Sequence, residues 1–306
     1  MERDGPDRVR VSGARGTPPT SSYKATATRL DGFRVIATAL FAGGDAAGRA
    51  RRAGEAIVAR AERIAVRAGH GPFAEASVEV AGGGDLSGAA GSTREAASAR
   101  EAVLKIAARH PERAALEILA EEIAPMGLVA QGMTGLTGGR PRPAPVVSLS
   151  HVLVEKSRVQ VAVELDGETV EVPAPAGAAG RAPAGSDPLP EDEPPASGGA
   201  RVVPLRSIAY ARSGDKGNDV NIGVIARRPE LAPVIREQVT ATRVRELFAR
   251  WLEGPVRRYE LPGLGAINIV LTDVLGGSGG TSSLRFDPQG KTYAAILLDL
   301  PVELPE

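Results

Sequence analysis

The chain has 306 residues, of which 37 are lysine or arginine and 37 are aspartate or glutamate, so its formal net charge is zero. A protein that binds nucleic acid by neutralising phosphates is basic overall or carries a basic block, and this chain is neither. The absence of cysteine excludes disulfides, thiol nucleophiles and cysteine-ligated metal sites. With 42% hydrophobic residues the chain can bury a core, and its length indicates about two domains.

The first part of the chain mixes strand and helix patterns. An alternating stretch at 8–12 predicts a short strand. Tyr23–Phe41 predicts a hairpin, because the dipeptide Asp31-Gly32 is typical of a tight turn. Small apolar residues recur at helical spacing over Asp45–Ala68, with Asp45 as a suitable N-cap, so a helix is expected there.

Further elements follow before residue 172. After a strand at Phe73–Val80, the sequence Ser-Thr-Arg-Glu at 92–95 fits a capping box and predicts a helix to about Arg109. Pro111 suits the first turn of a second helix, to about Ala124. A glycine-rich loop covers 127–145, and strands are expected at 145–154 and 158–172, the latter a hairpin at Asp166-Gly167.

Residues 173–200 consist mostly of alanine, proline and glycine, with one acidic patch at Glu191–Glu193. Such a composition buries too little surface to offset chain entropy. We therefore expect a flexible linker at 173–200 between a domain at 1–172 and a domain at 201–306.

In the second domain, the sequence pattern predicts two helices on one sheet. The helices begin at Pro229 and at a cap on Thr242. The expected strands are Val203–Ala211, Val220–Ala226, Arg257–Leu261, Ala266–Val274, and a final hairpin pairing Ser283–Phe286 with Thr292–Leu300. The fold class is therefore α+β, with a mixed strand and helix N-terminal domain and a C-terminal domain close to a ferredoxin-like α/β sandwich.

Three glycine-rich segments could bind an anion, because glycines let successive backbone N–H groups face one concavity. The first is the connection Ala211–Asn221, in which Lys216 supplies charge, and Ser213, Asn218 and Asn221 supply directional hydrogen bonds. An ordinary connection built from turn residues explains the same composition. The second segment is 276–283, and the third is 131–142, where Arg140 could clamp a carboxylate or phosphate. The candidate ligand-binding residues are Ser213, Gly214, Asp215, Lys216, Gly217, Asn218, Asn221, Arg140, Gly279, Gly280 and Thr281.

The residues alone give no catalytic constellation. His70 and His110 lie at predicted helix ends and His151 lies in a predicted strand, without metal-ligand spacing. No G-x-S-x-G elbow, Walker A loop or dinucleotide fingerprint is present. The catalytic residues are therefore unknown, and no metal site is expected.

The string RSIAYARSGDKGNDVNIGVI at 206–225 resembles the C-terminal module of the acyclic terpene utilization (AtuA) family. The later strings RRYELPGLGAINIVL and SLRFDPQGK continue the likeness in order. GPDRVRVSGARGTPP and GGRPRPAPVVSLSHVLV resemble the latter part of the family's main domain. This resemblance implies a partial AtuA-type main domain, a ferredoxin-like C-terminal domain, and a place in the breakdown of acyclic terpenes through acyl-CoA intermediates.

Two functions are consistent with this resemblance. The chain could bind an anionic metabolite through its glycine-rich loops, with acyl-CoA as a candidate ligand, no firm cofactor and no assigned reaction. Alternatively it could be a non-catalytic subunit whose partner chain supplies the N-terminal half that family members usually carry. Because the first residues are charged and no apolar stretch could span a bilayer, we expect a cytoplasmic protein with no membrane or nucleic-acid partner. Exposed sheet edges in the C-terminal domain could also support a homo-oligomer, whose stoichiometry the sequence does not fix.

Overall fold

The computed structural model describes residues 2–304 except 15, 17, 89–92, 174–176, 178–187, 190–200, 262 and 278. The chain divides into two compact units, one comprising Met1–Ala27 and Ser150–Gly185, the other Thr28–Leu149 and Ser186–Glu306. The paired strands β3 (Ser22–Ala42) and β7 (Ala144–Glu155) contribute residues to both units. The expected linker at 173–200 lies almost entirely outside the described residues.

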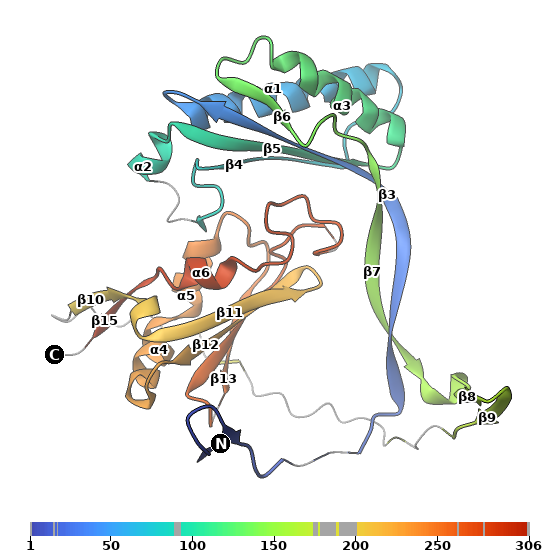
Figure 1. Cartoon of the computed structure of the whole chain (residues 1–306), viewed down its shortest axis with the longest axis vertical. Coiled ribbons are helices and arrows are strands. Elements are labelled where there is room, and N and C mark those ends of the chain that lie inside the picture. The colour runs from blue at the N-terminus through green and yellow to red at the C-terminus, as the bar shows by residue number, and fades with distance from the viewer. Residues whose placement is uncertain are drawn as a thin grey trace. The chain divides into compact units, whose positions relative to one another are not determined.

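The larger unit contains an antiparallel sheet with strand order β4-β5-β3-β6, to which β7 adds by pairing with β3. Figure 1 shows helices α1 and α3 together over one face of this sheet. The side chains that alternate toward these helices are buried, among them Val35 and Phe41 on β3, and they pack on Ile57 of α1 and Leu119 of α3. The bounds are α1 Ala46–Arg67, β4 Glu75–Ala81, α2 Arg94–Ala97, β5 Glu101–His110, α3 Arg113–Met126 and β6 Met133–Thr137.

The helix expected over 45–68 is confirmed, although Asp45 does not cap it. Asp45 occupies the N-cap position with a left-handed backbone (φ 53°), but its side chain makes no capping hydrogen bond. Its carboxylate instead accepts a hydrogen bond from Arg52 at 2.9 Å. Asp45 therefore pairs with Arg52, about two turns along the helix, and does not make the side-chain capping bond that was expected.

The hairpin expected at Tyr23–Phe41 is wrong, because β3 runs through this region as one strand. Its pairing with β5 continues without interruption from Phe33 to Ala42. Gly32 has a φ of +75°, and a β-carbon there would lie 2.7 Å from the carbonyl oxygen of His110. The Asp-Gly dipeptide thus permits a close approach to the end of β5 and does not reverse the chain.

The long helix expected over 92–109 is also wrong. The structure has only the four-residue α2, capped by Thr93, followed by strand β5. Leu104, Ile106 and Ala108 alternate toward the helices and are at most 2% exposed. The run Ala-Val-Leu-Lys-Ile-Ala-Ala has good helix propensity, but burial in the sheet outweighs that propensity.

The C-terminal part of the larger unit is built on a second antiparallel sheet, with strand order β11-β12-β14-β13. Helices α4, α5 and α6 share its core, in which Phe248 stacks on Tyr293 with ring centroids 5.1 Å apart. The one-turn 3-10 helices Leu205–Ser207 and Pro229–Leu231 and the pair β10–β15 lie outside this sheet. The bounds are β10 Arg201–Pro204, β11 Ala209–Lys216, β12 Asp219–Ala226, α4 Ala232–Gln238, α5 Ala241–Phe248, β13 Val256–Leu261, β14 Ala266–Leu271, α6 Tyr293–Leu297 and β15 Pro301–Leu304. The mixed strand and helix content confirms the expected α+β class.

Two expected C-terminal strands differ from the structure. The segment 203–211 is split between β10 and β11 by the 3-10 helix Leu205–Ser207. The final hairpin is wrong, because residues 293–297 form α6. Tyr293, Ile296 and Leu297 are buried at helical spacing, and Asp287 Oδ2 accepts a hydrogen bond from the Thr292 backbone N–H just before the helix.

The N-cap of α5 is Thr240 and not the expected Thr242. The Thr240 hydroxyl accepts the Arg243 N–H at 3.2 Å, and Thr240 is fully buried, whereas Thr242 is exposed. We expect Thr240→Ala to lower the free energy of unfolding by about 1 kcal/mol. Thr242→Ala, as the matched control, should change it by less than about 0.5 kcal/mol. Urea denaturation of both variants checks this, and equal losses would contradict the assignment of the cap.

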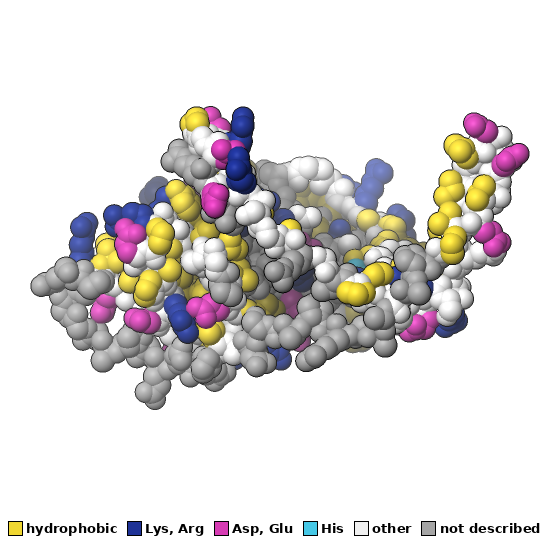
Figure 2. Space-filling model, turned by 90° about the horizontal axis from the view of Figure 1, so that it is seen from below, with side chains coloured by type: hydrophobic (Ala, Val, Ile, Leu, Met, Phe, Trp, Pro, Cys, Tyr) yellow, Lys and Arg dark blue, Asp and Glu magenta, His cyan; other side chains and the backbone are white. Residues whose placement is uncertain are grey.

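The smaller unit carries the hairpin β8 (Ala162–Leu165) and β9 (Glu168–Glu171), joined by Asp166-Gly167 as expected. Both turn residues have positive φ, 52° and 83°, as a two-residue turn of this kind requires. Val163 and Leu165 of this hairpin are 49% and 67% exposed. Figure 2 shows hydrophobic and acidic side chains together on the surface at its upper right. Among the helices of the described residues, none combines the length and the apolar character needed to cross a bilayer.

Candidate functional site

The most distinctive predicted segment, Ala211–Asn221, is a hairpin and not a loop. Only Gly217 and Asn218 lie outside the paired strands β11 and β12, whose register places Gly214 opposite Asn221 and Lys216 opposite Asp219. The ladder forms because Val220 and Ile222 alternate into the core beneath the helices. The strand pairing therefore fixes the positions of the polar and charged residues of this hairpin.

Several predicted ligand-binding side chains of this hairpin have partners within the protein. The buried Ser213 hydroxyl donates to the Gly290 carbonyl at 2.6 Å and accepts the Ala294 N–H at 3.0 Å, which ties β11 to α6. The amide of Asn218 donates to Asp273 at 3.0 Å. Asn221 donates to Asn268 on the neighbouring strand β14 at 3.2 Å. These contacts position the hairpin.

The second predicted segment meets the first directly. Gly279 has a φ of +81°, and a β-carbon there would overlap the carbonyl oxygen of Gly217. A β-carbon at Gly280 would lie 3.2 Å from Asp215 Oδ2. The two glycine-rich segments, distant in sequence, therefore pack with their backbones in contact, which only residues without side chains allow.

Two lysines contact Asp215, one through its carboxylate and the other through its main-chain carbonyl. Lys291 Nζ lies 3.6 Å from Asp215 Oδ1, and Lys216 Nζ donates to the Asp215 carbonyl at 3.0 Å. A β-carbon at Gly214 would lie 3.1 Å from Lys291 Nζ, so glycines leave space on both sides of this pair. We call Asp215, Lys216 and Lys291, with Gly214 and Gly280, the lysine site. Two exposed ammonium groups beside bare backbone can bind a carboxylate or phosphate.

Sequence reasoning missed Lys291. It is one of only five lysines in the chain, and it follows the turn sequence Asp287–Gly290. That scarcity was a usable signal, but nothing in the local sequence indicates that this lysine reaches Asp215.

The glycine-rich segment rests on a charged face of the first sheet, the face turned away from α1 and α3. Strand register sets two rows across this face, with Glu79 beside Lys105 and Glu75 beside Arg109. Lys105 Nζ donates to the Leu284 carbonyl at 2.6 Å and lies 3.4 Å from Glu79, whose carboxylate accepts the Phe286 N–H at 2.6 Å. Burial lowers the pKa of Lys105, and the charge of Glu79 opposes that shift.

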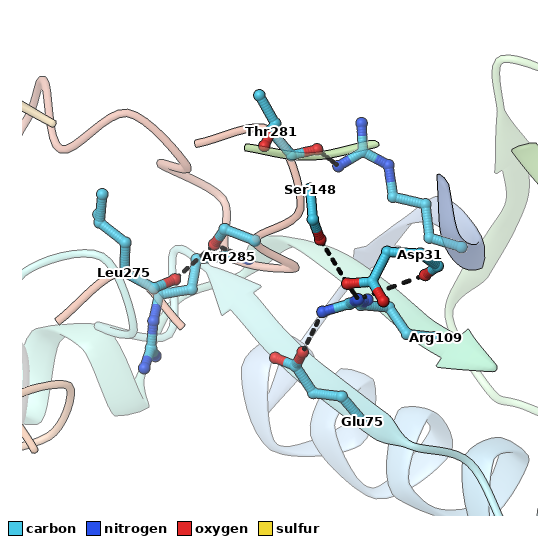
Figure 3. Close-up of polar contacts among 9 residues, drawn as sticks. Asp31, Glu75, Arg109, Ser148, Leu275, Thr281 and Arg285 are labelled. Carbon is cyan, nitrogen blue, oxygen red and sulfur yellow. Dashed lines mark hydrogen bonds and ion pairs between the residues drawn. The ribbon is translucent and has the colours of Figure 1, made fainter. Parts of the chain in front are cut away.

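Arg109 organises the second row, drawn in Figure 3. Its guanidinium donates to Asp31 at 2.9 Å and lies 3.7 Å from Glu75. The hydrogen bond from Ser148 is the main cause that lowers the pKa of Asp31, and burial raises the pKa of Glu75. Arg34 donates to the carbonyl of Thr281 at 3.2 Å. Thr281, a predicted ligand-binding residue of the glycine-rich segment 276–283, is therefore held through its backbone. The charged face thus fixes the loop that completes the lysine site.

Arg140 does not join the lysine site. It lies in the loop after β6 and forms an exposed ion pair with Glu121 of α3 at 3.3 Å. The histidines are also dispersed, with His70 against Glu112, His110 accepting the Glu112 N–H, and His151 against Thr26. Within the described residues, no three His, Asp or Glu side chains are grouped to hold a metal ion.

Comparison with known families gives two matches in chain order. Residues 1–165 match the model of the acyclic terpene utilisation family protein AtuA, and residues 203–303 match that of the AtuA ferredoxin-like domain. No curated protein and no solved structure matches the chain. The first match covers more than half of the chain and confirms the resemblance expected from the sequence, and the second confirms the ferredoxin-like C-terminal domain. The chain therefore belongs to the AtuA family of acyclic terpene utilisation.

Proposed function

We propose that this protein binds an anionic metabolite of acyclic terpene or related acyl-CoA breakdown at the lysine site. The observation that carries the proposal is that Lys291 contacts the carboxylate of Asp215 and Lys216 contacts its main-chain carbonyl, beside Gly214 and Gly280. An acyl-CoA, whose phosphates are strongly anionic, is the ligand class we favour. No bond-making step is assigned to these residues.

The proposed roles follow from exposure and charge. Lys291 is 55% exposed and Asp215 is 38% exposed, so the Lys291 ammonium can turn from the carboxylate to an arriving anion. An exposed ion pair is worth about 0–1 kcal/mol, which makes that exchange inexpensive. Asp215 would orient both lysines in the free protein, and Gly214 and Gly280 would let the anion approach the backbone.

Calorimetric titration with a panel of terpenoid and branched acyl-CoAs tests this binding. Lys216→Ala and Lys291→Ala should each weaken the affinity by about 5- to 10-fold, equivalent to about 1–1.4 kcal/mol. Because the interaction is electrostatic, affinity should also fall as the salt concentration rises. Lys24→Ala, which removes an exposed lysine from the other unit, is the matched control and should leave affinity unchanged.

Two outcomes would reject the proposal. One is the absence of heat with every acyl-CoA tested. The other is unchanged affinity in Lys216→Ala and Lys291→Ala, which would place any binding elsewhere.

A further inference from the structure

An open groove of about 700 Å³ runs between the C-terminal end of α3 and strand β6 with its following loop. Its volume falls within the range of about 300–1,000 Å³ that is typical of small-molecule sites. The lining is mostly apolar and includes Ala124, Pro125, Leu128, Met133 and Leu136. It shares no residue with the lysine site.

The groove exposes apolar side chains that a folded domain usually buries. Leu128, which lines the groove, is 90% exposed, and the adjacent Val129, which does not line it, is 74% exposed. Neighbouring exposed apolar side chains beside a groove are typical of a binding surface. Met133 adds a flexible, polarizable side chain that adapts to irregular ligands.

On the side of the groove formed by β6 and the loop after it, glycines leave the space free of side chains. Gly135 and Gly139 have φ values of +107° and +81°, and a β-carbon at either position would meet no atom within 4 Å. Their positive φ favours glycine, and no internal packing fills the space beside them. The loop after β6 thus borders the groove without obstructing it.

One cation stands at the rim. Arg140 lines the groove and, within the described part of the chain, pairs with Glu121, both side chains being about two-thirds exposed. Solvent weakens such an ion pair, so a ligand carboxylate can displace Glu121 from the guanidinium. The planar guanidinium fork suits a carboxylate in two-point contact.

We propose that the α3–β6 groove binds an amphiphilic carboxylate, with its aliphatic chain along Ala124, Leu128 and Leu136 and its carboxylate on Arg140. The chemical class is a medium-chain aliphatic acid. This inference goes beyond the acyl-CoA site proposed above and does not depend on it.

Equilibrium dialysis of the full chain with decanoate below its micellar concentration tests the inference, with decanol as the uncharged analogue and acetate as the chainless one. We expect saturable binding of decanoate and decanol and none of acetate. Ala124→Trp should fill the groove and weaken decanoate and decanol by more than about 10-fold, since it displaces the buried chain. Ala114→Trp, at an exposed alanine of the same helix, should change neither.

Charge variants separate the two halves of the ligand. Arg140→Gln should weaken decanoate by about 10-fold and leave decanol unchanged, as expected for loss of a charge-assisted hydrogen bond. Glu121→Gln should strengthen decanoate by about 3-fold, because it removes a competing carboxylate. Leu128→Asp is a second groove variant. Because Leu128 is largely exposed, this substitution tests the apolar contact with the ligand chain and should not disturb folding.

The inference is overturned if decanoate does not saturate, or if Ala124→Trp and Leu128→Asp both leave its affinity unchanged. It is also overturned if Ala124→Trp leaves decanoate affinity unchanged but alters the sedimentation coefficient of the protein. That result would make the groove a contact between protein chains. Lys216→Ala should not change decanoate affinity, so failure at this groove and failure at the lysine site are distinguishable.

Discussion

Replacing Lys105 by methionine should lower the free energy of unfolding by about 3–5 kcal/mol, the cost typical of breaking a buried ion pair. Methionine keeps the length and apolar stem of lysine, so the loss comes from the charge and its hydrogen bond. The side chains of Lys105 and Glu79 are 7% and 9% exposed, so the Glu79 carboxylate would remain buried without its counter-charge. The Leu284 carbonyl would also lose its donor.

A double variant distinguishes this cause from lost packing. Glu79→Gln alone removes the opposite charge, whereas Glu79→Gln with Lys105→Met removes both. The double variant should therefore be less destabilised than the sum of the two single variants, with a coupling of about 1–3 kcal/mol. Urea denaturation followed by the fluorescence of Trp251 measures this in the core that contains α5 and α6. Lys24→Met, at an exposed position, is the control, and a loss below about 1 kcal/mol in Lys105→Met would contradict a structural role for the pair.

The helices were predictable where periodicity and termination signals agreed. The spacing of Ile57 and Ala61 predicts α1. The helix expected after Pro111 is α3, but Pro111 precedes its N-cap Glu112 and does not lie in its first turn as expected. Glu101–His110 was not predictable, because alanine and leucine favour a helix and only pairing with β3 and β4 makes it a strand. Tyr293–Leu297 shows the opposite error, since its short apolar run is compatible with either structure until Phe248 packs against it.

The candidate site was predictable only in its local parts. The glycines around Asp215 and the glycines at 279–280 are visible in the sequence as segments that allow close backbone approach. Their contact and the arrival of Lys291 at Asp215 depend on packing between segments distant in sequence, and the support from Lys105 and Arg109 depends on strand register. Register sets which side chains share a face, and single-sequence patterns do not fix it between segments so distant.

Gly279→Ala should lower the free energy of unfolding by about 2–5 kcal/mol and also weaken acyl-CoA binding at the lysine site by more than about 10-fold. The positive φ of +81° alone costs an alanine about 1–2 kcal/mol. Its β-carbon would in addition overlap the Gly217 carbonyl oxygen, and relief of such overpacking costs typically about 1–3 kcal/mol. The relief must come from separation of the loop and the hairpin turn, which would move Gly280 away from Asp215.

Gly138→Ala isolates the steric part of this effect. Gly138 has a similar φ of +91°, but a β-carbon there meets no atom within 4 Å, so the variant carries backbone strain without overlap. It should lose only about 1–2 kcal/mol and bind acyl-CoA as the wild type does. Thermal unfolding and calorimetry of the two variants give the comparison. If both lost the same stability and Gly279→Ala retained full affinity, contact between the two glycine-rich segments would have no part in forming the lysine site.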